Sequence, residues 1–322
     1  MLPRTPLTLP RMTAFGQEVA AGLTATPKTL PSSWLYDAIG SSLFETITHL
    51  PEYGLTRADL SILQQHGPAL MASAGHPRLV LELGSGSGMK TRALLEAARR
   101  DGGLSYRPID VSPTALAICQ QQFLDLAGLN CAPITASYLE GLARGLAERP
   151  EDASALILFL GSTIGNFPPP DAASFLQAIR QLARPGDTLL LGTDLIKPVP
   201  MLLGAYDDPA GVTSAFNRNV LARINRELGG HFHPRQFAHE ARWDAAAARI
   251  EMHLRALKDQ IVRIDALDLE ITFRQDETIW TESSHKFTSA TALTLGEKAG
   301  WSPVLQVSDD AWGFAETLFT VQ

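Results

Sequence analysis

The sequence predicts an α/β fold built on a parallel β-sheet with helices on both faces, interrupted by an inserted segment. Continuous apolar runs such as Leu79–Leu83 and Ala155–Leu160 alternate with helical patterns between residues 79 and 193. Strands buried on both faces read as unbroken apolar runs, and helices between them are typical of parallel connections. After Lys197 this alternation stops, which indicates the insertion.

Helices separated by proline-containing segments are expected before the first strand. The first ten residues hold three prolines and read as an irregular arm. Helices are expected over residues 12–25, 34–50 and 56–72, the second of them broken around 40–42. Thr56 is predicted to cap the third helix with its hydroxyl, with Asp59 at the third position.

The sheet is expected to follow. Its strands are predicted at 79–83, 106–110, 132–135, 155–160 and 188–193, with helices at 89–100, 113–126 and 171–183. The later part is predicted to hold an amphipathic helix at 214–228, antiparallel strands at 249–257, 261–273 and 278–280, a helix at 288–299, and two last strands of the first sheet at 303–307 and 315–321. We therefore expect a nucleotide-binding domain of residues 60–195 plus 286–322 and a substrate-binding domain of residues 12–59 plus 196–285.

Composition and charge exclude several classes of function. The chain of 322 residues has a formal net charge of -7, which argues against a protein that grips nucleic acid phosphates. It shows no signal-peptide pattern at its start and no apolar stretch long enough to span a bilayer. Its two cysteines, Cys119 and Cys131, and its histidines show no metal-ligand spacing. We expect a monomeric, cytoplasmic protein whose partner is a small molecule, without metal, nucleic acid or membrane.

The sharpest local signal is a glycine loop at the end of the first apolar run. Gly84, Gly86 and Gly88 alternate with serines, so the backbone can turn tightly and approach a ligand closely. Glu82 precedes the loop, and Asp110 closes the next strand, where it can accept hydrogen bonds from ribose hydroxyls. The G-x-G-x-G spacing resembles motif I of class I methyltransferases, in which Glu82 would lie near the amino-acid end of the cofactor. A nicotinamide site, whose usual spacing is G-x-G-x-x-G, and a ligand-free turn are the alternatives.

A second segment follows the most apolar strand. Residues 159–169, FLGSTIGNFPP, lie where the active-site crevice of an open parallel sheet is found, and several amino-methyltransferases have an Asn-Pro-Pro-like element here. Asn166 offers both a donor and an acceptor, although a helix cap is an alternative role for it.

These and further segments resemble the L-histidine Nα-methyltransferases of ergothioneine biosynthesis over nearly the whole chain from about residue 20. The matching segments are 25–38, 50–53, 159–166, 193–197, 205–225 (AYDDPAGVTSAFNRNVLARIN), 249–252 and 281–287 (TESSHKF). The resemblance implies a class I methyltransferase sheet of Rossmann-like type with an inserted α+β substrate-binding domain. It also implies S-adenosylmethionine as cofactor, S-adenosylhomocysteine as product and L-histidine as substrate.

The resemblance also implies roles for individual residues. Asn166 and Tyr206 would hold the substrate carboxylate and α-amino end, and Gly161 would lie beside the amine. The imidazole would be bound by Glu282 and Ser284. The resemblance further implies that Met252 lines this pocket and that Tyr53 reaches the imidazole through a water molecule.

On the cofactor side, the resemblance assigns Tyr36, Gly84, Lys90 and Asp110. Three departures affect this side and the lid. The glycine loop at residues 85–89 is more like that of a generic methyltransferase than that of family members. Ser137 and Tyr138 stand where family members have an Asp-Phe pair near the adenine, and Gly54 replaces a second aromatic residue beside Tyr53.

We expect transfer of up to three methyl groups to the α-nitrogen of histidine, which gives hercynine. A strong base is not required, because an α-amino pKa of about 8 leaves neutral amine available; protons would leave to solvent or through a hydroxyl such as that of Thr163. Glu282 would provide specificity, since an apolar ring would leave its charge unpaired. The alternatives are methylation of another amino acid or amine by the same fold, and a non-catalytic cofactor-binding module.

Overall fold

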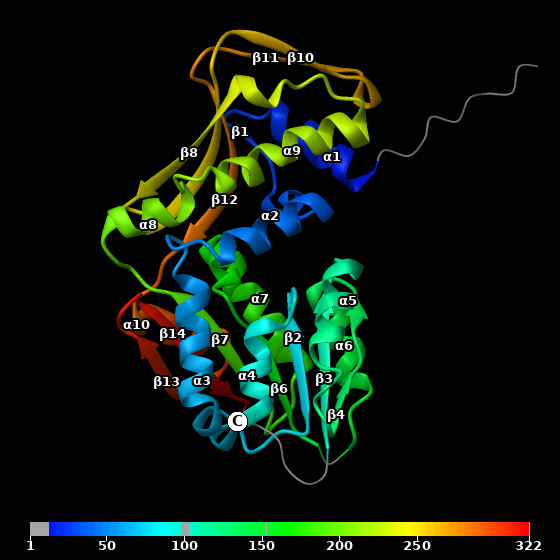
Figure 1. Cartoon of the computed structure of the whole chain (residues 1–322), viewed down its shortest axis with the longest axis vertical. Coiled ribbons are helices and arrows are strands. Elements are labelled where there is room, and N and C mark those ends of the chain that lie inside the picture. The colour runs from blue at the N-terminus through cyan, green and yellow to red at the C-terminus, as the bar shows by residue number, and fades with distance from the viewer. Residues whose placement is uncertain (1–12, 98–102, 152, 322) are drawn as a thin grey trace, which may run out of the picture.

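The computed structural model describes residues 13–97, 103–151 and 153–321. Among these residues the chain forms an eight-stranded sheet, with a four-stranded sheet and a two-stranded hairpin lying beyond one end of its strands (Figure 1). The expected arm over residues 1–10, the first residue of the helix expected at 12–25 and the end of the helix expected at 89–100 lie outside the described residues.

The larger sheet has the order β4-β3-β2-β6-β7-β14-β13, with β5 paired to β3. Its strands are β2 (Leu79–Leu83), β3 (Leu104–Asp110), β4 (Leu129–Cys131), β5 (Ile134–Thr135), β6 (Ala155–Phe159), β7 (Thr188–Asp194), β13 (Ser302–Asp309) and β14 (Phe314–Thr320). All neighbours are parallel except β14, which runs antiparallel to β7 and to β13. The strand order reverses between β2 and β6, which is the place where doubly wound sheets bind their ligands. The predicted α/β sheet is confirmed.

Helices cover both faces of this sheet because successive strand residues point to opposite sides. Along β6, Leu156 and Leu158 join the core beneath one helix layer, whereas Ile157 and Phe159 join the core beneath the other. The first layer contains α3 (Leu55–Ser73), α4 (Met89–Ala97) and α5 (Pro113–Gln122), and the second contains α6 (Tyr138–Ala147), α7 (Pro169–Leu182) and α10 (Ser289–Lys298).

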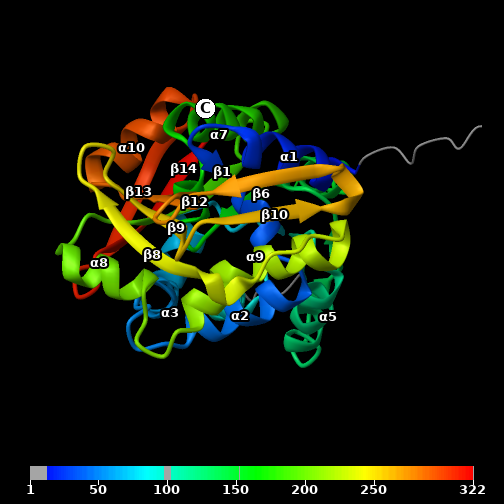
Figure 2. The ribbon, with the colours of Figure 1, turned by 90° about the horizontal axis from the view of Figure 1, so that it is seen from above.

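The smaller sheet, in the order β1-β12-β9-β8, is built from the N-terminal segment and from the insert between β7 and β13. Its strands are β1 (Lys28–Thr29), β8 (Phe237–Asp244), β9 (Arg249–Ala256) and β12 (Thr278–His285), and β10 (Gln260–Ile264) pairs with β11 (Leu269–Phe273). The helices are α1 (Ala14–Thr24), α2 (Ala38–Thr48), α8 (Val199–Tyr206) and α9 (Val212–Leu228), joined by the short turns η1 (Ser32–Leu35), η3 (Pro234–Gln236) and η4 (Asp265–Leu267). Figure 2, from above, shows α9 lying beside these strands, and α2 packs against α9.

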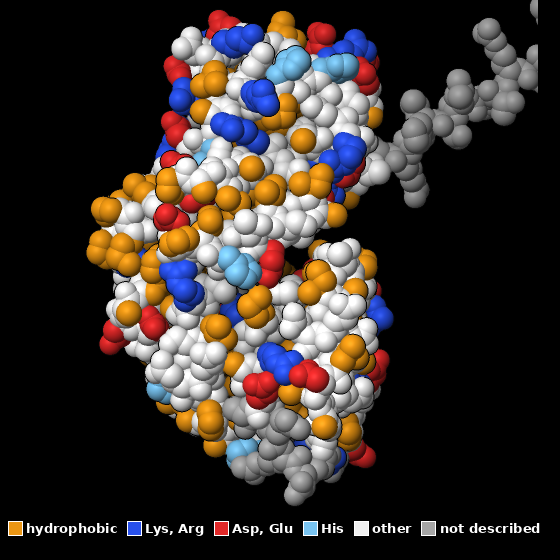
Figure 3. Space-filling view, in the orientation of Figure 1, with side chains coloured by type: hydrophobic (Ala, Val, Ile, Leu, Met, Phe, Trp, Pro, Cys, Tyr) orange, Lys and Arg blue, Asp and Glu red, His pale blue; other side chains and the backbone are white. Residues whose placement is uncertain are grey.

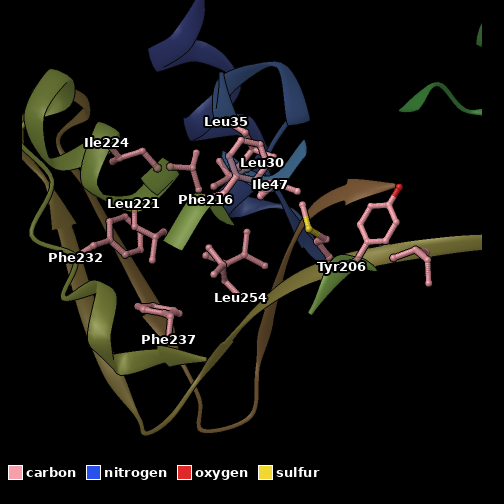
Figure 4. Close-up of a cluster of buried hydrophobic side chains, with 14 of the residues drawn as sticks. Leu30, Leu35, Ile47, Tyr206, Phe216, Leu221, Ile224, Phe232, Phe237 and Leu254 are labelled. Carbon is pink, nitrogen blue, oxygen red and sulfur yellow. The ribbon is translucent and has the colours of Figure 1, made fainter. Parts of the chain in front are cut away.

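One buried cluster unites these N-terminal and inserted segments. It includes Leu30 and Leu35 from the N-terminal part and Phe216, Ile224 and Leu254 from the insert (Figure 4). The helix α3 crosses the expected boundary at residues 59 and 60, because its first turns contribute to this cluster while its later turns pack on the larger sheet.

Several local predictions were wrong for physical reasons. Thr56 does not cap α3: the helix begins at Leu55, its N-cap is Gly54, and no side chain caps it. The helix α2 is unbroken at Gly40, where a Cβ would lie 1.7 Å from the Leu35 carbonyl oxygen, so this glycine permits close packing. The helix α8 was not predicted: Pro198 is its N-cap and Pro200 lies in its first turn, where proline fits a helix.

The strand predictions in the insert also needed correction. The single strand expected over 261–273 is the β10–β11 hairpin, whose connection places Asp268 at a φ of 45°. The strand expected over 278–280 continues to His285 as β12.

Candidate active site

The candidate site lies where the carboxyl ends of β2, β3, β6 and β7 face the smaller sheet. On the face shown in Figure 3, a hollow separates the upper part of the molecule from the α5 side of the lower part. The two parts touch at the glycine loop, where the Ser87 hydroxyl donates to Glu45 Oε1 of α2 at 3.3 Å.

The predicted glycine loop has the left-handed backbone that glycine permits. The φ angles of Gly84, Gly86 and Gly88 are 71°, 53° and 72°. A Cβ on Gly88 would lie 2.6 Å from Cys119 Sγ, so this glycine serves packing of the loop on α5. A Cβ on Gly86 would meet no atom within 4 Å, which leaves this part of the loop open to a ligand.

The two acids beside the loop have different surroundings. Asp110 is partly exposed and accepts from the Gly86 N–H at 3.1 Å and the Ser112 N–H at 2.9 Å, which leaves further lone pairs on both oxygens. Glu82 is buried and accepts from the hydroxyls of Thr91, at 2.7 Å, and Tyr106. Burial raises the pKa of Glu82 to about 7, against the effect of these hydrogen bonds. These contacts fix Glu82 beneath α4 and orient Asp110 toward the open loop.

Lys90 ends a chain of polar contacts that reaches the segment after β6. Its Nζ contacts Asp59 Oδ2 at 2.5 Å, and the same oxygen accepts from the Gly161 N–H at 3.0 Å. A Cβ on Gly161 would lie 3.0 Å from Lys90 Nζ, so Gly161 leaves room for this ammonium group. Glu316 of β14 is buried beside Asp59, and burial followed by the charge of Asp59 raises its pKa well above the usual range.

Tyr138, at the start of α6, lies beside the glycine loop, and Tyr36 lies between η1 and α2. The Tyr138 hydroxyl lies 3.2 Å from the position of a Cβ on Gly84, and burial, then the charge of Asp110, raises its pKa to about 12. Ser137, one residue earlier, is exposed and makes no capping bond. Tyr36 packs edge-on against Phe216 at 5.3 Å, and burial, then the charge of Glu282, raises its pKa well above the ordinary value.

A bulge in β12 decides where Glu282 points. The register shifts between Trp280 and Glu282, so that Glu282 pairs with Met252 of β9. Without the extra residue, Glu282 would face the side opposite to Ile279; with it, Glu282, Met252 and Ile279 share the face that carries the buried cluster. The Thr281 hydroxyl in the bulge donates to the Met252 carbonyl at 3.0 Å and to Asn217 Oδ1 at 2.7 Å.

Glu282 therefore reaches into an apolar environment from the sheet. It is 8% exposed, and its Oε2 atom is buried without a hydrogen-bond partner among the described residues. Burial raises the pKa of Glu282 to about 7, and the charge of Lys286 acts in the opposite direction. A ligand that offers an N–H group would satisfy this oxygen.

Tyr206 and Ser284 form a hydroxyl pair next to Glu282. Tyr206 lies at one edge of the buried cluster, and its hydroxyl points away from the other labelled side chains in Figure 4. That hydroxyl donates to Ser284 Oγ at 2.7 Å, and Lys286 Nζ donates to both oxygens, at 2.9 and 2.8 Å. Asp194, at the end of β7, contacts Lys286 Nζ at 2.9 Å and Lys197 Nζ at 2.5 Å.

The segment after β6 joins both sheets. It forms the turn η2 (Thr163–Asn166), where the Gly165 carbonyl is hydrogen-bonded to His285 Nδ1 at 2.9 Å. The Asn166 side chain is half-buried and has no partner among the described residues, so its amide is available to a ligand. The Thr163 hydroxyl donates to the Leu160 carbonyl at 3.1 Å, which leaves its lone pairs as acceptors.

Trp312 explains the glycine beside Tyr53. A Cβ on Gly54 would lie 2.2 Å from the Trp312 ring, so this ring, in the loop between β13 and β14, occupies the space above residue 54. Tyr53 is buried and packs edge-on against Tyr206 at 6.2 Å. The sequence alone gave no reason to connect these residues.

Three histidines of the insert have structural partners. His239 is hydrogen-bonded to the Tyr206 carbonyl at 2.7 Å, His253 to Glu251 at 3.0 Å and His231 to Asp265 at 3.0 Å. Within residues 13–97, 103–151 and 153–321, no group of three or more His, Cys, Asp or Glu side chains is arranged to hold a metal ion. In the same ranges, no helix has the length and apolar character needed to cross a bilayer.

The structure thus brings Tyr53, Tyr206, Met252, Glu282 and Ser284 together, and it groups the glycine loop with Asp110 and Tyr138. Sequence reasoning missed five polar or aromatic residues of the site, namely Asp59, Asp194, Lys286, Trp312 and Glu316. Two of them carried a usable signal, since Asp194 ends an apolar strand as Asp110 does, and Lys286 lies within the TESSHKF segment. Asp59 was assigned to a helix cap instead.

Comparison with known proteins gives consistent likenesses. Residues 15–321 match the family described as histidine-specific methyltransferase, SAM-dependent. The chain is 45% identical over 311 residues to the histidine N-alpha-methyltransferase of Mycobacterium tuberculosis, covering 95% of this chain and 94% of that protein. The protein of the same description from Mycolicibacterium smegmatis is 44% identical over 308 residues, with 95% and 94% covered. Ergothioneine biosynthesis protein 1 of Neurospora crassa is 34% identical over 206 residues, covering 63% of this chain and 23% of that protein.

Proposed function

This chain belongs to the SAM-dependent, histidine-specific methyltransferases, and from this we propose that it methylates the α-amino group of L-histidine up to three times, giving hercynine. It has the class I methyltransferase sheet, into which the second, smaller sheet is inserted. The name of the Neurospora crassa relative supports a place for this reaction in ergothioneine biosynthesis.

The residues around the glycine loop fit S-adenosylmethionine. The open space at Gly86 leaves room for a nucleoside, and the free lone pairs of Asp110 suit its ribose hydroxyls. We assign Tyr36, Ser137 and Tyr138 to the same ligand, with Lys90 at its methionine carboxylate. Gly84 and Gly88 shape the loop, and Glu82 supports it from beneath.

When bound, the cofactor supplies an electrophilic methyl group on a sulfonium. The task of this chain is then to aim a neutral amine at that carbon. Asn166 is proposed to hold the carboxylate. Tyr206, whose proton goes to Ser284, is proposed to accept from the amino end, beside Gly161, while Glu282 and Ser284 hold the ring. Two anchored ends fix the direction of the nitrogen, and such orientation is worth an effective molarity of ~10⁵ M or more.

Proton removal from the amine does not require a strong base in this site. An α-amino group with a pKa of about 8 is partly neutral at physiological pH. The Thr163 hydroxyl is oriented with its lone pairs free, so it can accept a hydrogen bond from the amine and pass protons toward solvent.

The single observation that carries the substrate assignment is the placement of Glu282. Its buried, unpartnered oxygen shares a face with Met252 and lies beside the hydroxyl pair of Tyr206 and Ser284. A flat ring with an N–H group suits an apolar pocket that ends in one carboxylate. We also propose a monomeric, cytoplasmic enzyme; the two free cysteines support that location.

Mass spectrometry of L-histidine incubated with the enzyme and S-adenosylmethionine tests the proposal. We expect mass gains of one, two and three methyl units on the α-nitrogen. Glu282→Ala should lower kcat/KM for histidine by at least about 100-fold, because the ring loses its charged partner. Glu240→Ala, which removes a carboxylate from the edge strand β8 of the same sheet, should leave the rate within about twofold.

Other outcomes separate the alternatives. Full activity of Glu282→Ala with histidine would favour an enzyme for another amine. Tight binding of S-adenosylhomocysteine without turnover of any amino acid would favour a non-catalytic binding module.

A further inference from the structure

Lys286 is a fully buried ammonium group at the substrate end of the site. Its side chain has 0% exposed surface, and its Nζ atom contacts Asp194 Oδ2, the Tyr206 hydroxyl and Ser284 Oγ at 2.9, 2.9 and 2.8 Å. These three contacts use all three N–H donors of the ammonium group. Asp194 supplies the counter-charge that such burial requires.

These contacts determine what Ser284 can offer to a ligand. A hydroxyl oxygen has two lone pairs and one proton. The lone pairs of Ser284 are occupied, because Tyr206 donates to this oxygen at 2.7 Å and Lys286 donates at 2.8 Å. No acceptor for the Ser284 proton is found among the described residues. Ser284 therefore faces a ligand only as a hydrogen-bond donor.

Glu282 offers the opposite polarity two residues away on the same strand. Its Oε2 atom is buried without a partner, and an ionised carboxylate only accepts hydrogen bonds. Residues two apart on a strand point to the same side, so the acceptor of Glu282 and the donor of Ser284 face one pocket.

We propose that Lys286, held by Asp194, makes Ser284 an obligatory donor, so that the pocket selects the neutral imidazole of histidine. The ring N–H would point to Glu282, and the bare ring nitrogen would accept from Ser284. An imidazolium would press a second N–H against an oxygen without a free lone pair, which is costly in a buried site. This inference rests on the proposed function, in which Glu282 and Ser284 face the ring. Lys286 acts through Ser284 and is a positioning residue.

The test must also take account of the other charged and titratable groups around Ser284. Asp194 and Lys197 form an ion pair, and His285, on the same strand, is hydrogen-bonded to the Gly165 carbonyl. The tyrosines facing this region are Tyr36, Tyr53 and Tyr206, and burial raises the pKa of each. Burial lowers the pKa of Lys197 to about 8, so this ammonium group stays mostly charged below pH 7. Between pH 5.5 and 7, the groups to separate are therefore Glu282, whose pKa burial raises to about 7, His285, whose pKa burial lowers, and the substrate ring.

Nitrogen NMR of ring-¹⁵N-labelled histidine reports the protonation state of the bound ring directly. We would measure the complex with full-length enzyme and S-adenosylhomocysteine at pH 6, where a free imidazole with a pKa of about 6.5 is mostly protonated. We expect one pyrrole-like and one pyridine-like nitrogen, as in a single neutral tautomer. Two imidazolium-like nitrogens would overturn the inference, and this wild-type measurement does not depend on any variant.

A pair of matched variants tests the role of Lys286. Lys286→Met frees one lone pair of Ser284, and the bound ring should then become imidazolium at pH 6. Asp194 keeps Lys197 and the Trp312 N–H as partners in this variant. Lys197→Met removes the other ammonium group from the same carboxylate without touching Ser284, so its bound ring should stay neutral. An unchanged ring state in folded Lys286→Met would contradict the proposal.

Binding titrations separate the ring from Glu282. A triazole analogue of histidine stays neutral over this pH range, so its pH dependence reports the protein alone. For wild-type enzyme, the affinity for histidine relative to the triazole should fall about tenfold for each pH unit below the ring pKa. In Lys286→Met this ratio should be flat. A flat ratio in wild-type enzyme would count against the inference.

Failure of the proposed function has a different signature. If Glu282→Ala and Ser284→Ala both leave histidine affinity unchanged, the ring does not lie between these residues, and the proposed ring site is wrong. If both weaken binding but the bound ring is imidazolium, only the role of Lys286 is wrong.

Discussion

Acidic residues in the interior of the protein differ in the partners that surround them. Glu82 is held by two hydroxyls, Asp194 by two ammonium groups, and Asp59 by Lys90 and a backbone N–H. Glu316 has neither carboxylate oxygen hydrogen-bonded in the described residues, and it lies against Asp59. A buried carboxyl group beside a second carboxylate is most stable when protonated.

Glu316→Gln tests this state through the pH dependence of stability. The pKa of Glu316 is raised in the folded protein, so its contribution is fully present below the unfolded pKa of about 4.3 and is lost as pH rises through the folded pKa. The free energy of unfolding of wild-type protein should therefore fall, relative to Glu316→Gln, by up to about 1.4 kcal/mol for each pH unit between the unfolded pKa and the folded pKa.

Urea unfolding at several pH values between 5 and 8 measures this difference. Gln keeps the size of the side chain and cannot ionise, so it serves as the reference state. A difference that does not vary with pH would mean that Glu316 ionises equally in the folded and unfolded protein.

At the scale of elements, the bulge in strand β12 determines the direction of Glu282. Its register shift turns Glu282 to the face of Met252, and the Thr281 hydroxyl holds the bulge through Asn217 and the Met252 carbonyl. The loop between β13 and β14 restricts the residue at the start of α3 to glycine, because Trp312 occupies the space that any side chain at residue 54 would need.

Thr281→Val should weaken histidine binding through the bulge. The substitution keeps the shape of the side chain but leaves Asn217 Oδ1 without its donor, which costs ~1–3 kcal/mol in stability. We expect KM for histidine to rise at least about fivefold, while the dissociation constant of S-adenosylhomocysteine stays within about twofold. Steady-state kinetics and calorimetric titration give the two values.

Thr278→Val on the same strand is the matched control, since no side-chain hydrogen bond of Thr278 is found among the described residues. It should change neither constant. Equal loss of cofactor and histidine binding in Thr281→Val would indicate general destabilisation and not a local effect of the bulge.

At the scale of the whole molecule, α3 connects the two cores. Leu55 and Ile62 belong to the cluster of the smaller sheet, whereas Leu63 and Leu70 pack on the larger one. Asp59, between them, links α3 to α4 and to the segment after β6. Neither core is complete without this helix, so the two should unfold together.

Scanning calorimetry checks this expectation. We predict one unfolding transition, which S-adenosylhomocysteine shifts upward as a whole, with a stabilisation of about 2.7 kcal/mol at 100 times its dissociation constant. Asp110→Ala should abolish the shift, and Asp171→Ala, on the exposed first turn of α7, should retain it. Two separate transitions, of which only one responds, would contradict the coupling of the cores.

The sequence by itself determined the alternation of buried strands and helices, the glycine loop and Asp110, because these features depend on neighbours within a few residues. Its wrong predictions have different causes. Beside Thr56, the distant ring of Trp312 fills the space at Gly54, where the helix begins. Gly40 lies against the nearby Leu35 carbonyl, and the β10–β11 turn depends on a left-handed residue, Asp268, that the sequence pattern did not reveal. The resemblance to a known family supplied Glu282 as a candidate, but no local pattern shows on which face it lies.

Only the tertiary structure decided how the polar groups of the site are paired. Gly161 and Asp59 are 102 residues apart, and Tyr206 and Ser284 are 78 apart, yet each pair is joined by a hydrogen bond. The bulge that turns Glu282 inward arises from strand pairing. The contacts that leave Ser284 only a proton to offer arise from the hydrogen bonds of a buried ammonium group. Such pairing minimises the cost of burial over the whole fold, and a linear pattern of residues does not specify it.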